Sequence, residues 1–223
     1  MKSFKQHILE KLKVSVRNTT KHTLFPETKN ELKQMIEDEI SKHGNECSLN
    51  HIDVSEITDM SSLFYYSKFN GNISEWNVSN VTNMSGMFYA SSFTGDISDW
   101  DVSKVENMYK MFRESKFNND ISMWDVSNVT NMKEMFEFSK FNSDISDWNV
   151  SNVKDMEYMF RAADFNGNIS NWDVSSVIDM HGMFENSKFN GNISKWNVSN
   201  VIKMEYIFTR SPLENNPPKW YKK

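Results

Sequence analysis

The sequence contains a single cysteine, Cys47, among its 223 residues, so an internal disulfide framework is excluded. Cys47 follows Asn45 and Glu46 instead of an apolar signal, which argues against lipid attachment at this residue. We expect a reduced thiol with a structural or incidental role. No apolar run is long enough to cross a membrane.

The usual signatures of catalytic and metal sites are also missing. No pair among the 5 histidines has the H-E-x-x-H spacing of a zinc protease, and there is no glycine-rich phosphate loop or nucleophile elbow. Cys47 with His43 or His51 is the one nucleophile–base pair that the sequence offers. Nearness in sequence does not show that these side chains are in contact in the fold. Because the usual catalytic and cofactor-binding motifs are missing, we predict that the protein is not an enzyme and needs no cofactor.

The chain does contain one motif that is repeated at a fixed interval. Its 7 tryptophans each lie 24 residues apart, at Trp76, Trp100, Trp124, Trp148, Trp172, Trp196 and Trp220. Columns of Phe, Ile, Val and Met recur at the same interval. The methionine columns suggest either a soft metal or haem site or an adaptable packed interior, and we favour the interior.

Local patterns within each unit predict its secondary structure. Apolar residues have the i, i+3, i+6, i+7 spacing of one helical face, as in Val81, Met84, Met87 and Phe88. Ser79 precedes them where a capping residue would stand. Turn-forming pairs such as Gly71-Asn72 precede a short alternating Ile-Ser-x-Trp-x-Val segment that is typical of a strand. We therefore predict an α/β repeat of about seven strand–helix–turn units that stack on one another.

Aspartate or asparagine recurs at two positions of each unit, as in Asp96 with Asp101 and Asp120 with Asp125. Aligned carboxylates are one way in which repeat proteins bind calcium. Asparagine replaces aspartate in many copies, namely Asn72, Asn77, Asn149, Asn168, Asn192 and Asn197. Since this exchange suits side chains that satisfy backbone groups of turns, we favour that role and predict no metal site.

The two ends of the repeat region, residues 51–211, depart from the pattern. In residues 24–50, the sequence Thr28-Lys29-Asn30-Glu31 fits a helix capping box, and Gly44 stands where that helix should stop. We expect this helix to cover the first unit. Residues 212–223 contain Pro212, Pro217 and Pro218 and are predicted to form the C-terminal cap.

Residues 1–23 differ from the rest in charge. They hold six Lys or Arg and one Glu, a balance of +5 (6 − 1) in a chain whose total is −5. Their apolar residues Phe4, Ile8, Leu9 and Leu12 are separated by polar ones, which indicates a basic amphipathic leader and not a secretion signal. We expect the leader to dock to a protein; a membrane surface remains an alternative, and nucleic acid is disfavoured. The leader also resembles short leaders on proteins of some large tailed gut bacteriophages.

The repeated pattern Asn-Ile-Ser-x-Trp-Asn/Asp-Val-Ser-x-Val-x-Asn/Asp-Met-x-x-Met-Phe, as in Asn72–Phe88 and Asp120–Phe136, resembles the BspA-like leucine-rich-repeat surface proteins and related 24- or 25-residue repeats of mycoplasma lipoproteins. The similarity covers about Ile52 to Phe208. It implies a leucine-rich-repeat-like, right-handed solenoid and a role in adhesion or protein binding at cell surfaces, without catalytic residues. The missing secretion signal and the short array depart from that family.

Partner-binding residues are expected where the columns vary between units, because stacking does not dictate those positions. The aromatic candidates are Tyr65, Tyr66, Tyr89, Tyr109, Phe138, Tyr158 and Tyr206. The alternative is that these rings pack against neighbouring helices.

Taken together, the patterns predict a non-catalytic scaffold that binds a protein, in the cytoplasm or on a virion. The open alternatives are a structural or decoration component of a phage particle and a cell-surface adhesin, the latter implied by the resemblance.

Overall fold

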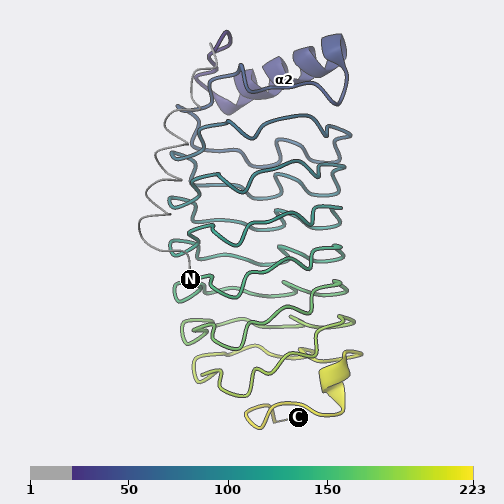
Figure 1. The fold of residues 1–223 in the computed structure, drawn as a ribbon. Helices are drawn as coiled ribbons and strands as arrows, with labels where there is room; N and C mark the ends of the chain where they lie inside the picture. The colour runs from purple at the N-terminus through teal and green to yellow at the C-terminus, as the bar shows by residue number, and fades with distance from the viewer. Residues whose placement is uncertain (1–21, 223) are drawn as a thin grey trace, which may run out of the picture.

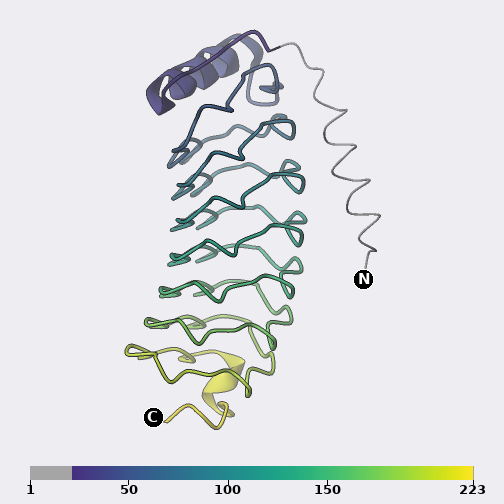
Figure 2. The ribbon, with the colours of Figure 1, turned by 90° about the vertical axis from the view of Figure 1, so that its left-hand side faces the viewer.

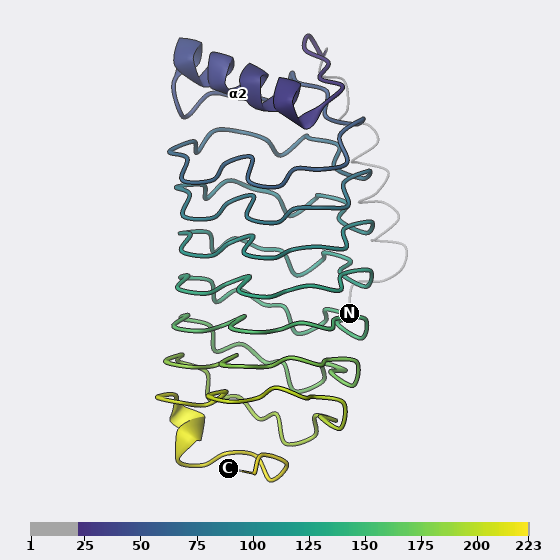
Figure 3. The same ribbon diagram turned by 180° about the vertical axis from the view of Figure 1, so that it is seen from behind.

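Residues 22–222 are described by a computed structural model, in which the chain winds into coils that stack along one axis (Figure 1). Helix α2 (Lys29–His43) lies across one end of the stack, and the short 3-10 helix η1 (Pro212–Glu214) lies at the other end. Views turned by 90° and by 180° show the same succession of coils (Figure 2 and Figure 3).

The expected unit of strand, helix and turn is wrong. Within residues 22–222, α2 is the one α-helix, and β-structure is limited to isolated parallel bridges such as Asp59 with Asn83. The α/β repeat and the leucine-rich-repeat-like solenoid are therefore not supported. The architecture is a stack of turn-rich coils without a sheet among the described residues.

Residues 81–88, which were expected to be helical, form consecutive tight turns. The N–H groups of Val81 and Met87 donate to carbonyls three residues earlier, at 2.9 and 3.2 Å. Gly86 has a φ of 61°, and the equivalent residue of every other unit is also left-handed, which a continuous right-handed helix does not allow. Consecutive turns return every third residue to the interior, so they reproduce the apolar spacing of a helical face. Ser79 caps no helix and instead donates through Oγ to Asn77 Oδ1 (2.8 Å).

Neighbouring coils are joined by backbone hydrogen bonds at alternate residues. In the first coil, the N–H groups of Met60, Ser62 and Phe64 each donate over 2.9 Å to a carbonyl of the next coil. The acceptors are Asn83, Ser85 and Met87. Because this register is repeated along the stack, residues that lie 24 positions apart stand side by side. The columns of the sequence are therefore columns in space.

The tryptophan column shows why one large residue recurs in the interior. The indole N–H of Trp100 donates to the carbonyl of Ile73 (3.2 Å), and its ring stacks on that of Trp76 with centroids 6.4 Å apart. The same indole-to-carbonyl bond occurs at every tryptophan from Trp76 to Trp220. Each indole thus fills the core and satisfies its own buried donor. The methionine columns from Met60 to Met183 are also buried in this core, as expected for packing side chains.

The predicted N-terminal helix is confirmed, with the predicted residues at both ends. Thr28 Oγ1 accepts from the Glu31 N–H (3.3 Å), and Gly44, with a φ of 85°, follows the last residue of α2. The buried face of α2, Leu32 and Ile36, belongs to the same core as the coils. Helix α2 therefore covers the first coil.

At the other end, the residues after η1 continue the tryptophan column. Trp220 stacks on Trp196 at 6.5 Å, and its indole donates to the Ile193 carbonyl (2.8 Å). Among the described residues, no helix is both long and apolar enough to cross a membrane.

Candidate partner-binding face

The seven predicted aromatic residues lie on one side of the stack. They occupy four positions of the turn segment that follows the first methionine of each coil, and the register between coils aligns these segments. The most exposed members are Tyr65, Tyr66, Phe138 and Tyr206, at 49, 59, 45 and 60 % exposure. Tyr89, Tyr109 and Tyr158 are half-buried. We call this surface, residues 61–66 and the equivalent segments of the later coils, the aromatic face.

A cluster of three tyrosines forms the N-terminal part of the aromatic face. The ring of Tyr65 lies 4.5 Å from that of Tyr66 and 4.9 Å from that of Tyr89, both edge-on. Tyr89 also donates through its hydroxyl to Glu114 (3.3 Å). Mutual contact restricts these rings while leaving Tyr65 and Tyr66 accessible.

Two arginines hold Phe138 in the middle of the face. The Arg113 guanidinium lies 5.2 Å from the Tyr89 ring and 5.9 Å from the Phe138 ring. Arg161 lies 5.3 Å from Phe138 and 4.9 Å from Tyr158. Cations at this range are attracted to the faces of aromatic rings. The arginines therefore connect aromatic residues of successive coils.

Glu137 is the buried carboxyl group that contacts both guanidinium groups. Its carboxylate lies 2.7 Å from Arg113 Nε and accepts from Arg161 at 2.9 Å, and the side chain is 1 % exposed. Burial raises the pKa of Glu137 to about 7, although the Arg113 charge acts to lower it. The carboxyl group thus carries a desolvation cost that its two ion pairs offset in part.

The C-terminal part of the face is organised around His181. Its Nε2 lies 2.8 Å from the Tyr158 hydroxyl, and its ring meets the Tyr206 ring edge-on at 5.4 Å. Tyr109 stands apart from this chain of contacts and is covered by the Lys110 ammonium, 4.6 Å from its ring centre. The structure therefore connects six of the seven candidates through ring or cation contacts and places Tyr109 beside them.

Sequence reasoning missed the charged residues of the aromatic face. Once the 24-residue register is applied, one column has alternating charge, in the order Arg113, Glu137, Arg161 and Glu185. Alternation down a column is the signal that identifies an ion-pair ladder between coils.

Backbone conformation was also missed. Tyr66, Phe138, Tyr158 and Tyr206 all have φ between 53° and 60°. Left-handed backbone is uncommon for bulky residues and raises the energy of the folded chain.

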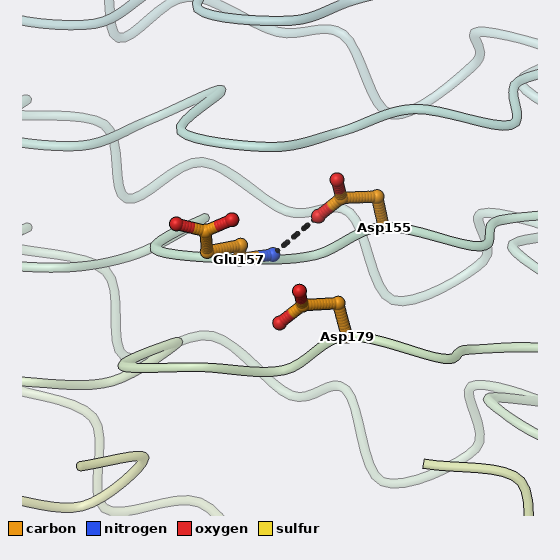
Figure 4. Close-up of side chains that lie close together, drawn as sticks. All are labelled: Asp155, Glu157 and Asp179. Atoms are coloured by element: carbon orange, nitrogen blue, oxygen red, sulfur yellow. Dashed lines mark hydrogen bonds between the residues drawn. The ribbon is translucent and has the colours of Figure 1, made fainter. Parts of the chain in front are cut away.

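Three carboxylates gather beside this face, from Asp155, Glu157 and Asp179 (Figure 4). One oxygen of each lies within 4.8 Å of the others. The Asp155 carboxylate accepts from the Glu157 N–H (2.9 Å), and burial raises the pKa of Asp155. Lys133 pairs with Glu157 at 2.6 Å and Lys203 with Asp179 at 2.9 Å. Protein cations and a backbone donor therefore occupy the cluster, whose ion pairs join coils in columns separate from that of Arg113 and Glu137.

The Asp and Asn ladders of the sequence have the predicted backbone role. Asp96 and Asp101 accept from the N–H groups two residues ahead, at 3.0 and 3.1 Å. The asparagine copies make the same contact, as Asn72 and Asn197 show at 3.0 and 3.2 Å. This prediction is confirmed.

The structure does not support Cys47 as a catalytic nucleophile. Burial raises the pKa of the Cys47 thiol, whereas a reactive cysteine needs a lowered one. His43 and His51 both face Glu39, at 3.8 and 3.2 Å. The leader candidates Phe4, Ile8, Leu9 and Leu12 lie outside the described residues.

Fold and site define a repeat protein whose coils align one aromatic and charged face. Residues 30–140 and 114–220 match the family described as "Mycoplasma protein of unknown function, DUF285". The chain belongs to this family. No curated protein and no solved structure matches it.

Proposed function

We propose that this chain is a non-catalytic scaffold that binds a protein partner through the aromatic face. The observation that carries the proposal is the alignment of the seven aromatic residues on one side, with Tyr65, Tyr66, Phe138 and Tyr206 about half exposed or more. Aromatic residues and arginine are the types enriched at protein interfaces.

The aromatic side chains of the face are already held in place in the free chain, which favours binding of a partner. Phe138 is held between Arg113 and Arg161, and Tyr66 is in contact with Tyr65 and Tyr89. Binding then costs less side-chain entropy than it would for freely rotating rings. The half-buried members support the exposed ones, so a partner meets a rigid surface.

The N-terminal part of the face indicates what kind of contact a partner makes there. The residues at the face positions of the first two coils are uncharged: Ser61, Ser62, Tyr65, Tyr66, Ser85, Gly86, Tyr89 and Ala90. These residues offer apolar and hydrogen-bonding contacts, and Arg113 and Glu114 beside Tyr89 are the charged groups next to them. The basic residues 1–23 are proposed, on their charge alone, as a second docking segment.

A site-specific photo-crosslinker tests the aromatic face. It is placed at Tyr66 or Phe138 in the full chain and, as a control, at Met123, which is 56 % exposed but lies outside the face. In extracts of the source cells, crosslinks to one protein from Tyr66 and Phe138, but not from Met123, support the proposal.

The matching variants are the triple change Tyr65→Ser, Tyr66→Ser and Phe138→Ser, and the control Met123→Ser. The triple variant should lose the crosslinked partner, while the control keeps it. Retention of the partner by a folded triple variant would refute the proposal. Deleting residues 1–23 separates the contribution of the leader.

A further inference from the structure

Within residues 22–222, one half of the last coil lacks the neighbour that each earlier coil has. In the coil before it, three alternate N–H groups donate onward: Met180 to Lys203 (2.8 Å), Gly182 to Glu205 (2.9 Å) and Phe184 to Ile207 (3.0 Å). The equivalent N–H groups of Met204, Tyr206 and Phe208 have no acceptor within residues 22–222. The Ile202 carbonyl likewise receives no donor there, whereas that of Ile178 accepts from the Ile202 N–H (2.8 Å). We call these four groups the terminal edge.

Two apolar side chains at the terminal edge are less buried than their counterparts in the coil before. Val177 and Met180 are 0 % exposed, but Val201 and Met204 in the same columns are only partly buried. Ile202 is 78 % exposed and its counterpart Ile178 is 44 % exposed, so this side chain faces outward in both coils. An edge with unpaired backbone groups and apolar side chains is a template for a further chain segment.

The C-terminal residues cover only the other half of the last coil. Trp220 stacks on Trp196, and Tyr221 meets Phe208 edge-on at 5.2 Å. Lys222 then stands at the position that valine fills in each unit from Val54 to Val198, and it is exposed. The described chain therefore leaves the half around Val201 and Ile202 uncovered.

Hydrogen-bond polarity decides what can occupy the terminal edge. A second copy docked end to end would bring N–H donors against N–H donors. A second copy in head-to-tail order would meet α2, whose Leu32 and Ile36 are packed on the first coil. The occupant must offer carbonyls at alternate residues, one N–H for the Ile202 carbonyl and apolar side chains in the valine and methionine columns.

We propose that the terminal edge binds an extended segment of another polypeptide that has the column pattern of this chain's own repeat unit and adds to the stack as one more coil. The stack itself displays the required complement, because every inner coil receives such a segment in the same register. Main-chain hydrogen bonds would provide affinity, and the valine and methionine positions would provide selectivity. This surface is distinct in chemistry from the aromatic face, although Tyr206 belongs to both, through its N–H at the edge and its ring on the face.

The probe is a synthetic peptide with the sequence of residues 77–91, which contains no Lys, Arg, Asp or Glu. In the folded chain this segment supplies the carbonyls of Asn83, Ser85 and Met87 and the N–H of Thr82 to the coil before it. Hydrogen exchange of the full chain is measured with and without the peptide. Amide exchange at Met204, Tyr206 and Phe208 should slow by at least about tenfold at saturation.

Matched controls test both sides of the contact. A Thr82→Pro peptide lacks the donor for the Ile202 carbonyl and should protect much less. Val201→Lys in the full chain places a charge in the apolar column of the uncovered half and should abolish protection, with a thermal melt to check that the variant is folded. Met123→Lys should have no effect. Equal protection by the Thr82→Pro or a scrambled peptide would overturn the proposal. So would concentration-dependent protection of the edge without peptide, which would identify a second copy as the occupant. Tyr66→Ser should leave peptide binding unchanged, so this test is independent of the aromatic face.

Discussion

At the residue scale, two adjacent alanines stand in opposite backbone environments. Ala162 has a φ of 51°, and Ala163, which is 2 % exposed, does not share that conformation. Left-handed backbone costs a residue with a Cβ about 1–2 kcal/mol, while glycine elsewhere costs about 0.5–1 kcal/mol in entropy.

We expect Ala162→Gly to raise the free energy of unfolding by up to about 1 kcal/mol, and Ala163→Gly to lower it by about 1 kcal/mol or more. Denaturant titration of both variants beside the unchanged chain provides the measurement. Equal losses in the two variants would show that φ at residue 162 stores no strain.

A second residue-scale prediction concerns Glu137. Its pKa is raised from 4.5 to about 7, so between these values the folded chain holds a proton that the unfolded chain has released. The free energy of unfolding should therefore fall, through this group, as the pH rises from 4.5 to about 7, and stay level above that.

Glu137→Gln removes this titration while keeping the shape of the side chain. The stability of the unchanged chain relative to the glutamine variant should decrease across the same pH window in thermal or denaturant melts. Parallel pH profiles for the two proteins would contradict the raised pKa.

At the scale of the element, each coil depends on the bond from its indole to the previous coil. Trp148→Phe removes the donor to the buried Ile121 carbonyl (3.1 Å) and should cost about 1–3 kcal/mol of unfolding free energy for the unsatisfied group. Trp220→Phe removes the same bond at a partly buried end and should cost less. Denaturant midpoints of the two variants measure these losses of unfolding free energy. A larger loss in Trp220→Phe than in Trp148→Phe would mean that the C-terminal end of the stack, and not its interior, limits stability.

The same elements show how far the sequence predicts this fold. The tryptophan interval gives the repeat, the Thr28–Gly44 signals give α2, and the buried columns are those of the pattern. The spacing of Val81, Met84 and Met87 cannot separate a helix from consecutive turns, because both return every third residue to the core. Only the left-handed residues decide between them, and their positions hold Ser, Lys, Glu, Tyr and Gly alike.

The candidate face was predictable in part for a related reason. Variable columns identified the aromatic residues, since variation marks positions that stacking does not fix. The clamp of Phe138 by Arg113 and Arg161 depends on which residues become neighbours between coils. That information requires the register, which single-unit patterns do not contain.

At the scale of the whole molecule, stability should be unequal along the axis because the two ends are built differently. Every coil is stabilised chiefly by its nearest neighbours, as in other repeat arrays. The first coil has α2 on one side and a coil on the other, while half of the last coil has a neighbour on one side only. Opening of the last coil therefore disrupts fewer contacts than opening of any other.

We therefore expect amide exchange in the free chain to be fast at Met204 and Phe208 and slow at both Met156 and Met60, whose N–H groups donate to the following coil at 2.9 Å. Residue-resolved hydrogen exchange measures this directly. Equally fast exchange at Met60 and Met204 would mean that α2 does not protect the first coil. Equally slow exchange at all three methionines would mean that the terminal edge is already covered in solution. The Met204 N–H has no hydrogen-bond acceptor within residues 22–222, so its slow exchange would require an acceptor from outside them.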